Sequence, residues 1–193
     1  MAALSAERFF KRLLTDDDRA SLLAFNHDFH LLVPFTTNAE ELGHGAIGLR
    51  GRGSTRLFDA IVYALSQFAG LGNRRALIVL SDGADVESDF PFGQVVAAAV
   101  QAGVAVYPIS LLGVDRATPA QLAELADESG GRSYSVRSID DLDRIYRQIE
   151  EQLRSQYLLV YRPPPNDRLE FRPVRVEVAR PGLEAHNVHG YYP

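Results

Sequence analysis

Residues Arg74 to Asp85 read RRALIVLSDGAD, and this stretch decides the fold. Ala76 to Leu80 is an unbroken apolar run, which is typical of a strand covered on both faces in a parallel sheet. The run ends at Ser81-Asp82-Gly83. Open α/β sheets bind their ligands at the carboxyl ends of the strands, so Asp82 is a candidate functional residue. Gly83 permits a turn and a close approach to the backbone. The plainer interpretation is an Asp-Gly turn that ends the strand.

A second polar cluster, Gly53-Ser54-Thr55, opens the helix that precedes this strand. A glycine-rich lead-in to a helix can hold a phosphate. This one lacks the lysine and the spacing of a phosphate-binding loop, so a nucleotide site is not favoured. Ser54 or Thr55 could equally be an ordinary N-cap, and a cap and a ligand role can coexist.

The composition fits one domain with a substantial core and a small appendage. The chain has 193 residues, 46% of them hydrophobic, and a net charge of -5. No basic block suggests a nucleic-acid surface. Cysteine is absent, which excludes disulfides and thiolate metal sites. The first residues lack the apolar core of a signal peptide, so the sequence as written predicts a cytoplasmic protein.

Hydrophobic periodicity and breaker residues predict alternating helices and strands. Residues 19–25 and 28–36 are expected to form a hairpin, and residues 76–80, 104–110 and 132–136 further strands. Helices are expected at 5–14, with Ser5 as cap, and at 38–49, 56–68, 92–102, 119–129 and 138–155. This order predicts an α/β fold with a doubly wound, mostly parallel sheet and helices on both faces.

The tail differs in character from residue 156 onward. Tyr157 to Tyr161 and the alternating run Val174 to Val178 are expected to be strands. We therefore expect an α/β domain over residues 1–155 and a β extension over residues 156–193 that packs on it.

Several segments resemble the von Willebrand factor type A (VWA) family, in particular its bacterial VWFA-related members. The matching segments are residues 53–60, 76–85, 103–109, 129–131, 156–161 and 190–192. The resemblance implies a non-enzymatic module that binds a protein partner at the top of the sheet through Mg²⁺ or Mn²⁺. In that family a divalent ion is held at an adhesion site by an Asp-x-Ser-x-Ser loop, a threonine and an aspartate. By the resemblance, Thr55 and Asp82 would be the threonine and aspartate ligands, with Ser54, Gly83 and Asp85 beside the partner.

The sequence departs from the family at the first strand, which carries Asp-x-Ser-x-Ser and is normally central in the sheet. Neither the strand nor the motif precedes residues 5–14. The resemblance therefore implies a slot in the sheet and weak or absent metal binding, because two ligands hold Mg²⁺ poorly. A fragment of a longer, secreted protein is the favoured explanation. In the alternative, the hairpin pairs directly with residues 74–80, or another chain fills the slot, as in a homodimer.

Two other functions remain open at this point. One is a metal-independent scaffold of the same fold that binds through its helices or its β extension. The other is a hydrolase that uses Asp82, which is disfavoured because no nucleophile elbow, histidine triad or interpretable second carboxylate is present.

Overall fold

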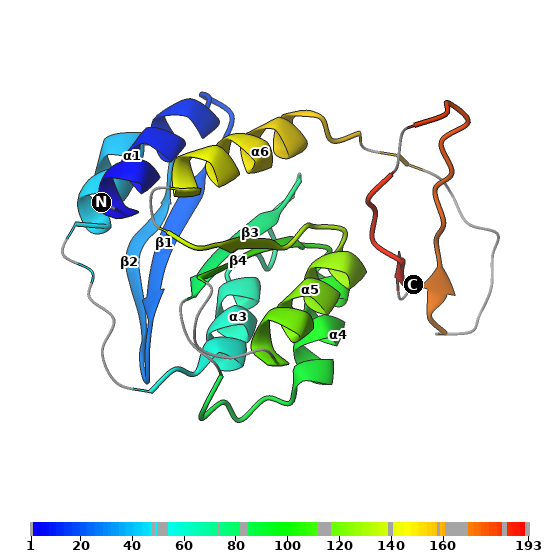
Figure 1. Cartoon of the computed structure of the whole chain (residues 1–193), viewed down its shortest axis with the longest axis horizontal. Helices are drawn as coiled ribbons and strands as arrows, with labels where there is room; N and C mark the ends of the chain where they lie inside the picture. Colours follow the sequence, from blue (N-terminus) through cyan, green and yellow to red (C-terminus); the bar gives the residue numbers. More distant parts are fainter. Residues whose placement is uncertain are drawn as a thin grey trace.

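The computed structural model describes residues 2–47, 49, 54–72, 74–81, 85–111, 117–138, 141–157, 159–160, 170–182 and 185–191 (Figure 1). Its elements, in chain order, are α1 (Ala2–Leu13), β1 (Ala20–Phe25), β2 (Phe29–Thr36), α2 (Ala39–Gly45), α3 (Leu57–Ser66), β3 (Ala76–Ser81), α4 (Phe92–Ala102), β4 (Ala105–Leu111), α5 (Ala117–Ser129), β5 (Tyr134–Val136), α6 (Leu142–Arg154), β6 (Arg172–Pro173) and β7 (Gly190–Tyr191). Among the described residues, no helix is long and apolar enough to cross a bilayer.

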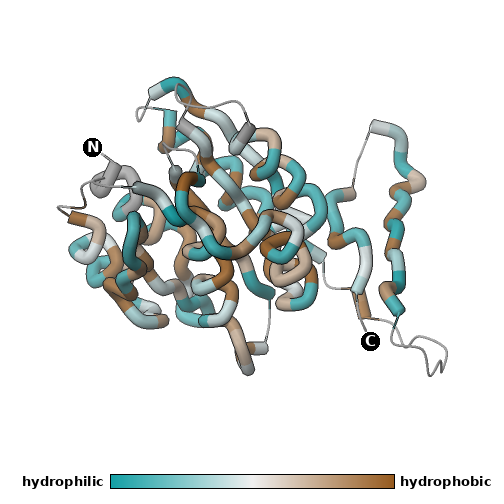
Figure 2. Tube along the Cα trace, turned by 90° about the horizontal axis from the view of Figure 1, so that it is seen from below, coloured by the Kyte–Doolittle hydropathy of each residue, from teal (hydrophilic) through white to brown (hydrophobic). Residues whose placement is uncertain are grey.

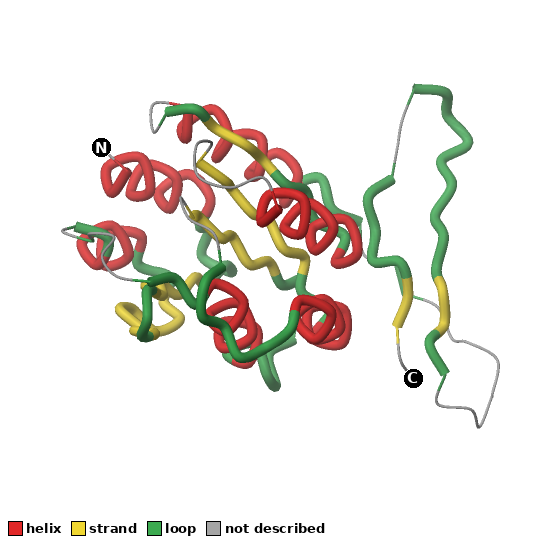
Figure 3. Tube along the Cα trace, turned by 60° about the horizontal axis from the view of Figure 1, so that its bottom comes forward, coloured by secondary structure: helices red, strands yellow, loops and turns green. Residues whose placement is uncertain are grey.

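The centre of the fold is a parallel sheet in the order β3-β4-β5 (Figure 3). Each strand is joined to the next by a helix, α4 and then α5. Figure 1 shows α3, α4 and α5 on one side of the strands and α1 and α6 on the other. The α/β class and the doubly wound arrangement expected from the sequence are therefore confirmed.

The side chains of β3 divide between two hydrophobic clusters, as a strand buried on both faces requires. Leu77 and Val79 join the cluster built around α3, α4 and α5. Ile78 and Leu80 join the cluster that contains Phe9 of α1 and Ile149 of α6. The unbroken apolar run thus contributes side chains to both hydrophobic clusters.

Glycines follow the ends of α4 and α5, as the sequence indicated. Gly103 closes α4 in the left-handed conformation, with a φ of 59°. Ser129, at the end of α5, accepts a 3.0 Å hydrogen bond from the Val106 amide of β4. Gly131 follows two residues later, and a Cβ there would collide with the Val106 carbonyl. The Ser-Gly-Gly segment is therefore required for the close approach of α5 to β4.

The hairpin β1–β2 is a separate antiparallel sheet within the described residues. Its turn is closed by the Asn26 amide, which donates to the Asp28 carbonyl at 3.0 Å. The hairpin was correctly predicted. The proposal that it pairs directly with residues 74–80 is wrong, because β1 and β3 belong to different sheets.

Two helix starts differ from the prediction. α1 begins at Ala2, so Ser5 lies inside the helix and is not its cap. α6 begins at Leu142 and not at Ser138, with Asp141 at the N-cap and no side-chain capping bond. In both helices the observed first residue therefore differs from the one that capping chemistry indicated.

The tail contains less strand than expected. Tyr157, Leu159 and Val160 are not in a strand, and Leu158 and Tyr161 lie outside the described residues. Val174–Val178 keeps its alternation of hydrophobic and hydrophilic residues (Figure 2) but forms no ladder. Instead Arg172 and Pro173 pair with Tyr191 and Gly190. The tail reaches α5 through His189, whose Nδ1 lies 3.3 Å from Glu128 Oε2.

Candidate functional site

Three segments meet at the carboxyl end of β3: the β1–β2 turn, the start of α3 and the loop that leads from β3 to α4. The Arg56 amide donates to the Asn26 carbonyl at 3.0 Å. The Val86 amide donates to the Thr55 carbonyl, also at 3.0 Å. These two backbone bonds bring the residues around Ser54 and Thr55 beside those around Asp85.

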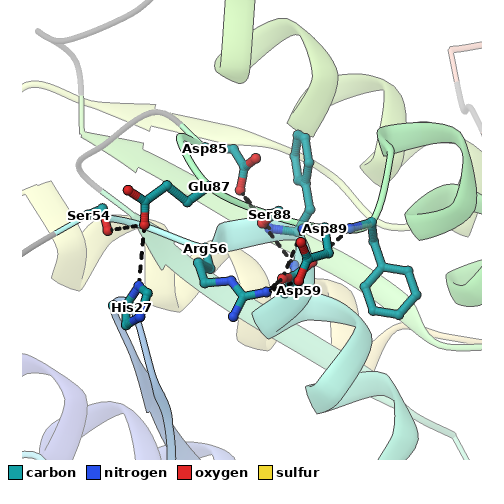
Figure 4. A network of polar contacts seen from close by, with 10 residues as sticks. His27, Ser54, Arg56, Asp59, Asp85, Glu87, Ser88 and Asp89 are labelled. Carbon is teal, nitrogen blue, oxygen red and sulfur yellow. Dashed lines mark hydrogen bonds and ion pairs between the residues drawn. The ribbon is translucent and has the colours of Figure 1, made fainter.

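The N-terminus of α3 is capped by side chains from the β3–α4 loop (Figure 4). The Phe58 amide donates to Asp85 Oδ1 and to Ser88 Oγ, both at 3.1 Å. The Asp59 amide donates to Ser88 Oγ at 3.2 Å. The helix has no capping bond from its own Arg56. Asp85 and Ser88 therefore satisfy amides that would otherwise lack partners at the helix start, and the negative charge of Asp85 suits the helix dipole.

Asp59 of α3 in turn accepts hydrogen bonds from the β3–α4 loop. It is 4% exposed and accepts hydrogen bonds from the Asp89 amide at 3.1 Å and the Phe90 amide at 2.9 Å. Arg56 Nη2 lies 2.6 Å from Asp59 Oδ2 and also contacts Asp89. A buried carboxylate needs such partners, and here two amides and a guanidinium provide them.

A more exposed group of side chains connects the hairpin turn to the same loop. Ser54 Oγ donates to Glu87 Oε2 at 2.6 Å, and His27 Nδ1 lies 3.3 Å from the same oxygen. The hydrogen bond from Ser54, followed by that from His27, lowers the pKa of Glu87 below its ordinary value of 4.5. Both partners converge on one carboxylate oxygen, an arrangement different from a relay in which a histidine activates a serine.

The structure brings some of the predicted site residues together. Ser54, Thr55 and Asp85 lie within this network, whereas Asp82 and Gly83 lie outside the described residues. Sequence reasoning missed Asp59 and Ser88. A signal for each was present, because Asp85-x-x-Ser88 follows the Asp-Gly and Asp59 interrupts the apolar stripe of α3.

The family is decided by comparison with known proteins. The family model of the von Willebrand factor type A domain matches residues 3–148. The chain belongs to the von Willebrand factor type A (VWA) family. None of the curated proteins compared with it matches.

Solved VWA structures show the same fold at low sequence identity. A von Willebrand factor type A protein from Catenulispora acidiphila is 18% identical, with a TM-score of 0.67, over 78% of this chain and 37% of that one. The vWF domain of the type V pili tip protein Mfa5 from Porphyromonas gingivalis is 13% identical, with a TM-score of 0.63, over 83% of this chain and 90% of that one.

A third structure is proximal thread matrix protein 1 from the mussel byssus, whose metal-ion-dependent adhesion site (MIDAS) holds zinc. It is 16% identical, with a TM-score of 0.61, over 79% of this chain and 43% of that one. This chain therefore spans less than half the length of two of the three proteins. At these identities the likeness shows the fold alone.

The described residues do not make a VWA metal site on their own. Among them, no group of three or more histidine, cysteine, aspartate or glutamate side chains could hold a metal ion. Asp85 Oδ1 already accepts bonds from Phe58 and from Ser88 Oγ. In the described part of the chain, this oxygen therefore serves the cap of α3.

Proposed function

We propose that this chain is a non-enzymatic VWA module that binds a protein partner at the carboxyl end of β3. The observation that carries the proposal is the junction of the β1–β2 turn, the start of α3 and the β3–α4 loop, which is held by the Arg56–Asn26 and Val86–Thr55 backbone bonds. Ser54, Thr55 and Asp85 lie at this junction, and α/β sheets commonly bind ligands at this edge, which supports the proposal. VWA domains are in general interaction modules, which supports binding over turnover.

The proposed partner contact is centred on Thr55 and Asp82, with Ser54, Gly83 and Asp85 around it. Hydroxyl and carboxylate oxygens are the ligands that Mg²⁺ and Mn²⁺ prefer. An acidic side chain of the partner would complete such a set. Two protein ligands alone predict weak affinity for the ion, so the partner's carboxylate is expected to strengthen metal binding and the metal to strengthen partner binding.

Calorimetric titration with Mg²⁺ and Mn²⁺ tests the metal component. We expect weak saturable binding that is lost in Asp82→Ala and in Thr55→Val. The matched control is Asp89→Ala, which removes a carboxylate of the same loop that is exposed and contacts Arg56. Saturable binding that survives Asp82→Ala, or binding that Asp89→Ala removes equally, would contradict the assignment of the ligands.

A metal-independent scaffold is the second candidate, and one observation favours it. The oxygens of Asp85, Ser88 and Asp59 are used for capping α3 and the loop that follows β3. Complete absence of saturable heat with both ions would favour this candidate over the first.

We also propose that the open side of β3 supports a homodimer. The carrying observation is that β3 has a bonded neighbour on one side only, in the described part of the chain. Unpaired strand edges are templates for association with another chain.

A further inference from the structure

A small polar cavity lies between β5 and the C-terminal half of α6. Its volume is about 270 Å³, and it is lined by Arg132, Tyr134, Gln148, Glu151, Gln152 and Ser155. The four residues from α6 and its C-cap follow the i, i+3, i+4, i+7 spacing of a single helix face. The cavity lies at the amino end of β5, so in this parallel sheet it is at the opposite edge from the candidate site at the carboxyl end of β3.

Two opposite charges line this cavity without a partner of their own. Within the described part of the chain, neither Arg132 nor Glu151 forms an ion pair, whereas the neighbouring Glu150 is paired with Arg154 at 3.2 Å. Because Arg132 and Glu151 line the same small cavity, one small molecule can reach both. The cavity therefore offers a cation and an anion to a ligand that carries the complementary pair.

The guanidinium of Arg132 is positioned by an aromatic ring. Arg132 Cζ lies 6.0 Å from the centroid of the Tyr134 ring, which is the range of a cation–π contact. This contact uses the face of the ring and leaves the N–H groups of the guanidinium available. Arginine binds a carboxylate through two parallel N–H···O bonds, so a ligand carboxylate is the natural partner here.

Tyr134 also orients an amide of α6 beside the arginine. The Tyr134 hydroxyl donates to Gln152 Oε1 at 3.1 Å. Burial raises the pKa of Tyr134, against a lowering by the nearby Arg132, so the phenol keeps its proton and remains a donor at neutral pH. Since the oxygen of the Gln152 amide accepts this bond, its NH₂ group stays available as a second donor to a carboxylate.

The α6 side of the cavity suits a positively charged group. Glu151 lies in the last turn of α6, and Ser155 is the C-cap of the helix. The carbonyl end of a helix carries partial negative charge and favours cations. The full charge of the Glu151 carboxylate acts in the same direction. An ammonium group of the ligand therefore fits beside Glu151.

We propose that this cavity binds a short amino acid in its zwitterionic form, with the ligand carboxylate on Arg132 and the ligand ammonium group on Glu151. The inference goes beyond the proposed partner contact and involves no metal ion. Methylene carbons between the two ligand charges would pack against the partly buried Tyr134 ring. The cavity is smaller than the pockets of drug-sized ligands, which measure about 300–1,000 Å³, so the ligand is restricted to a small molecule.

NMR titration of the whole chain tests the proposal, with EDTA in every sample so that the metal site has no influence. Glycine, β-alanine and 4-aminobutanoate separate the same two charges by increasing lengths, and acetate and methylammonium carry one charge each. We expect one of the three zwitterions to shift the Arg132 Nε–Hε and Gln152 amide signals saturably. Its dissociation constant should be at least about tenfold below those of acetate and methylammonium, which corresponds to about 1.4 kcal/mol. No saturable shift with any zwitterion, or an affinity no better than that of acetate, would overturn the proposal.

Two variants that each remove one charge assign the roles of the side chains. Arg132→Gln should abolish the advantage of the zwitterion over methylammonium, and Glu151→Gln its advantage over acetate. Both side chains are exposed, so the fold should be retained, and backbone amide signals outside the cavity verify this in the same spectra. The matched control is Arg147→Gln, exposed on α6 and outside the cavity lining, which should bind like the unaltered chain. Zwitterion binding that is unchanged in Arg132→Gln and Glu151→Gln, or weakened equally in Arg147→Gln, would also overturn the proposal.

Discussion

β3 and β4 are neighbouring strands of similar apolar composition, but their side chains are buried to different extents. They pair residue by residue, with Ile78 opposite Tyr107 and Leu80 opposite Ile109. Tyr107 is 2% exposed and Ile109 is fully buried, whereas Ile78 and Leu80 are only partly buried. Among the described residues, β4 has a strand on each side and β3 has a strand on one side only. Apolar composition predicts that both strands are central, but the number of neighbouring strands decides how much of each is removed from water.

The two strands should therefore differ in what they contribute to stability. Burial stabilises roughly in proportion to the apolar area removed from water, at about 25 cal/mol per Å². Truncation of the partly buried Leu80 should therefore lower the free energy of unfolding less than truncation of the fully buried Ile109. The difference can be measured in matched positions, since Leu80 and Ile109 are register partners and contribute to the same cluster.

The largest expected effect comes from Ile109→Ala. It should lower the free energy of unfolding by about 2–5 kcal/mol, because it removes a fully buried side chain and leaves a cavity. The matched variant Leu80→Ala should cost less than half as much. Urea unfolding followed by circular dichroism checks both values, provided that the m-value is unchanged. Equal losses at the two positions would mean that β3 is as enclosed as β4.

The buried side chain of Tyr146 also leads us to expect a loss of stability at high pH. Tyr146 is stacked on Phe9, with ring centroids 4.6 Å apart, in the cluster that contains Tyr107 and Ile109. Burial, with a smaller contribution from the Asp143 carboxylate, raises the pKa of Tyr146 to about 12 from the ordinary value of 10.0. The folded protein then holds the phenol proton more tightly than the unfolded chain does. The contribution of the protonated Tyr146 to the free energy of unfolding is complete below pH 10 and is lost as the pH rises toward 12.

We expect a loss of roughly 2 kcal/mol from Tyr146 by pH 12, since each pKa unit corresponds to about 1.36 kcal/mol. Burial raises the pKa of Tyr107 in the same direction. Chemical denaturation between pH 9 and pH 12 measures the slope, and Tyr146→Phe should reduce it. A slope that Tyr146→Phe leaves unchanged would show that another group controls alkaline unfolding.

The smallest predicted effect lies at the carboxyl end of β3, where side chains of the β3–α4 loop cap the start of α3. Ser88→Ala removes the hydroxyl that caps the Phe58 and Asp59 amides and should cost about 1 kcal/mol. The control is Ser135→Ala, at an exposed position on β5. Thermal unfolding of both variants makes the comparison. If Ser88→Ala were as neutral as the control, the network would not hold the end of β3.

Much of the fold was predictable from the sequence, because local signals and tertiary packing agree there. The Phe92–Ala102 helix with Gly103 as its stop, and the hairpin around Asn26, were predicted almost residue for residue. The tail was not. Tyr157 and Val160 have a strand-like composition, but a strand forms only where another strand pairs with it, and composition does not specify that partner.

The candidate site was only partly predictable. Ser54 and Thr55 were singled out as a polar cluster at the start of a helix, and Asp85 was added through the resemblance to the family. The capping of α3 by Asp85 and Ser88 was not, because it joins residues that are distant in sequence and depends on how the β3–α4 loop folds over the helix. The position of Asp82 and Gly83, outside the described residues, stays a prediction.

The central claim is that, within the described part of the chain, β3 is less enclosed than β4, and amide hydrogen exchange on this 193-residue chain tests it most directly. The measurement is made by NMR on the unaltered chain, in dilute solution and with EDTA. Residues of a parallel strand bond alternately to its two sides, so we expect every second amide of β3 to exchange rapidly while the amides of β4 remain protected. Uniform protection of β3 at the level of β4 would show that its second edge is already paired and would contradict the account.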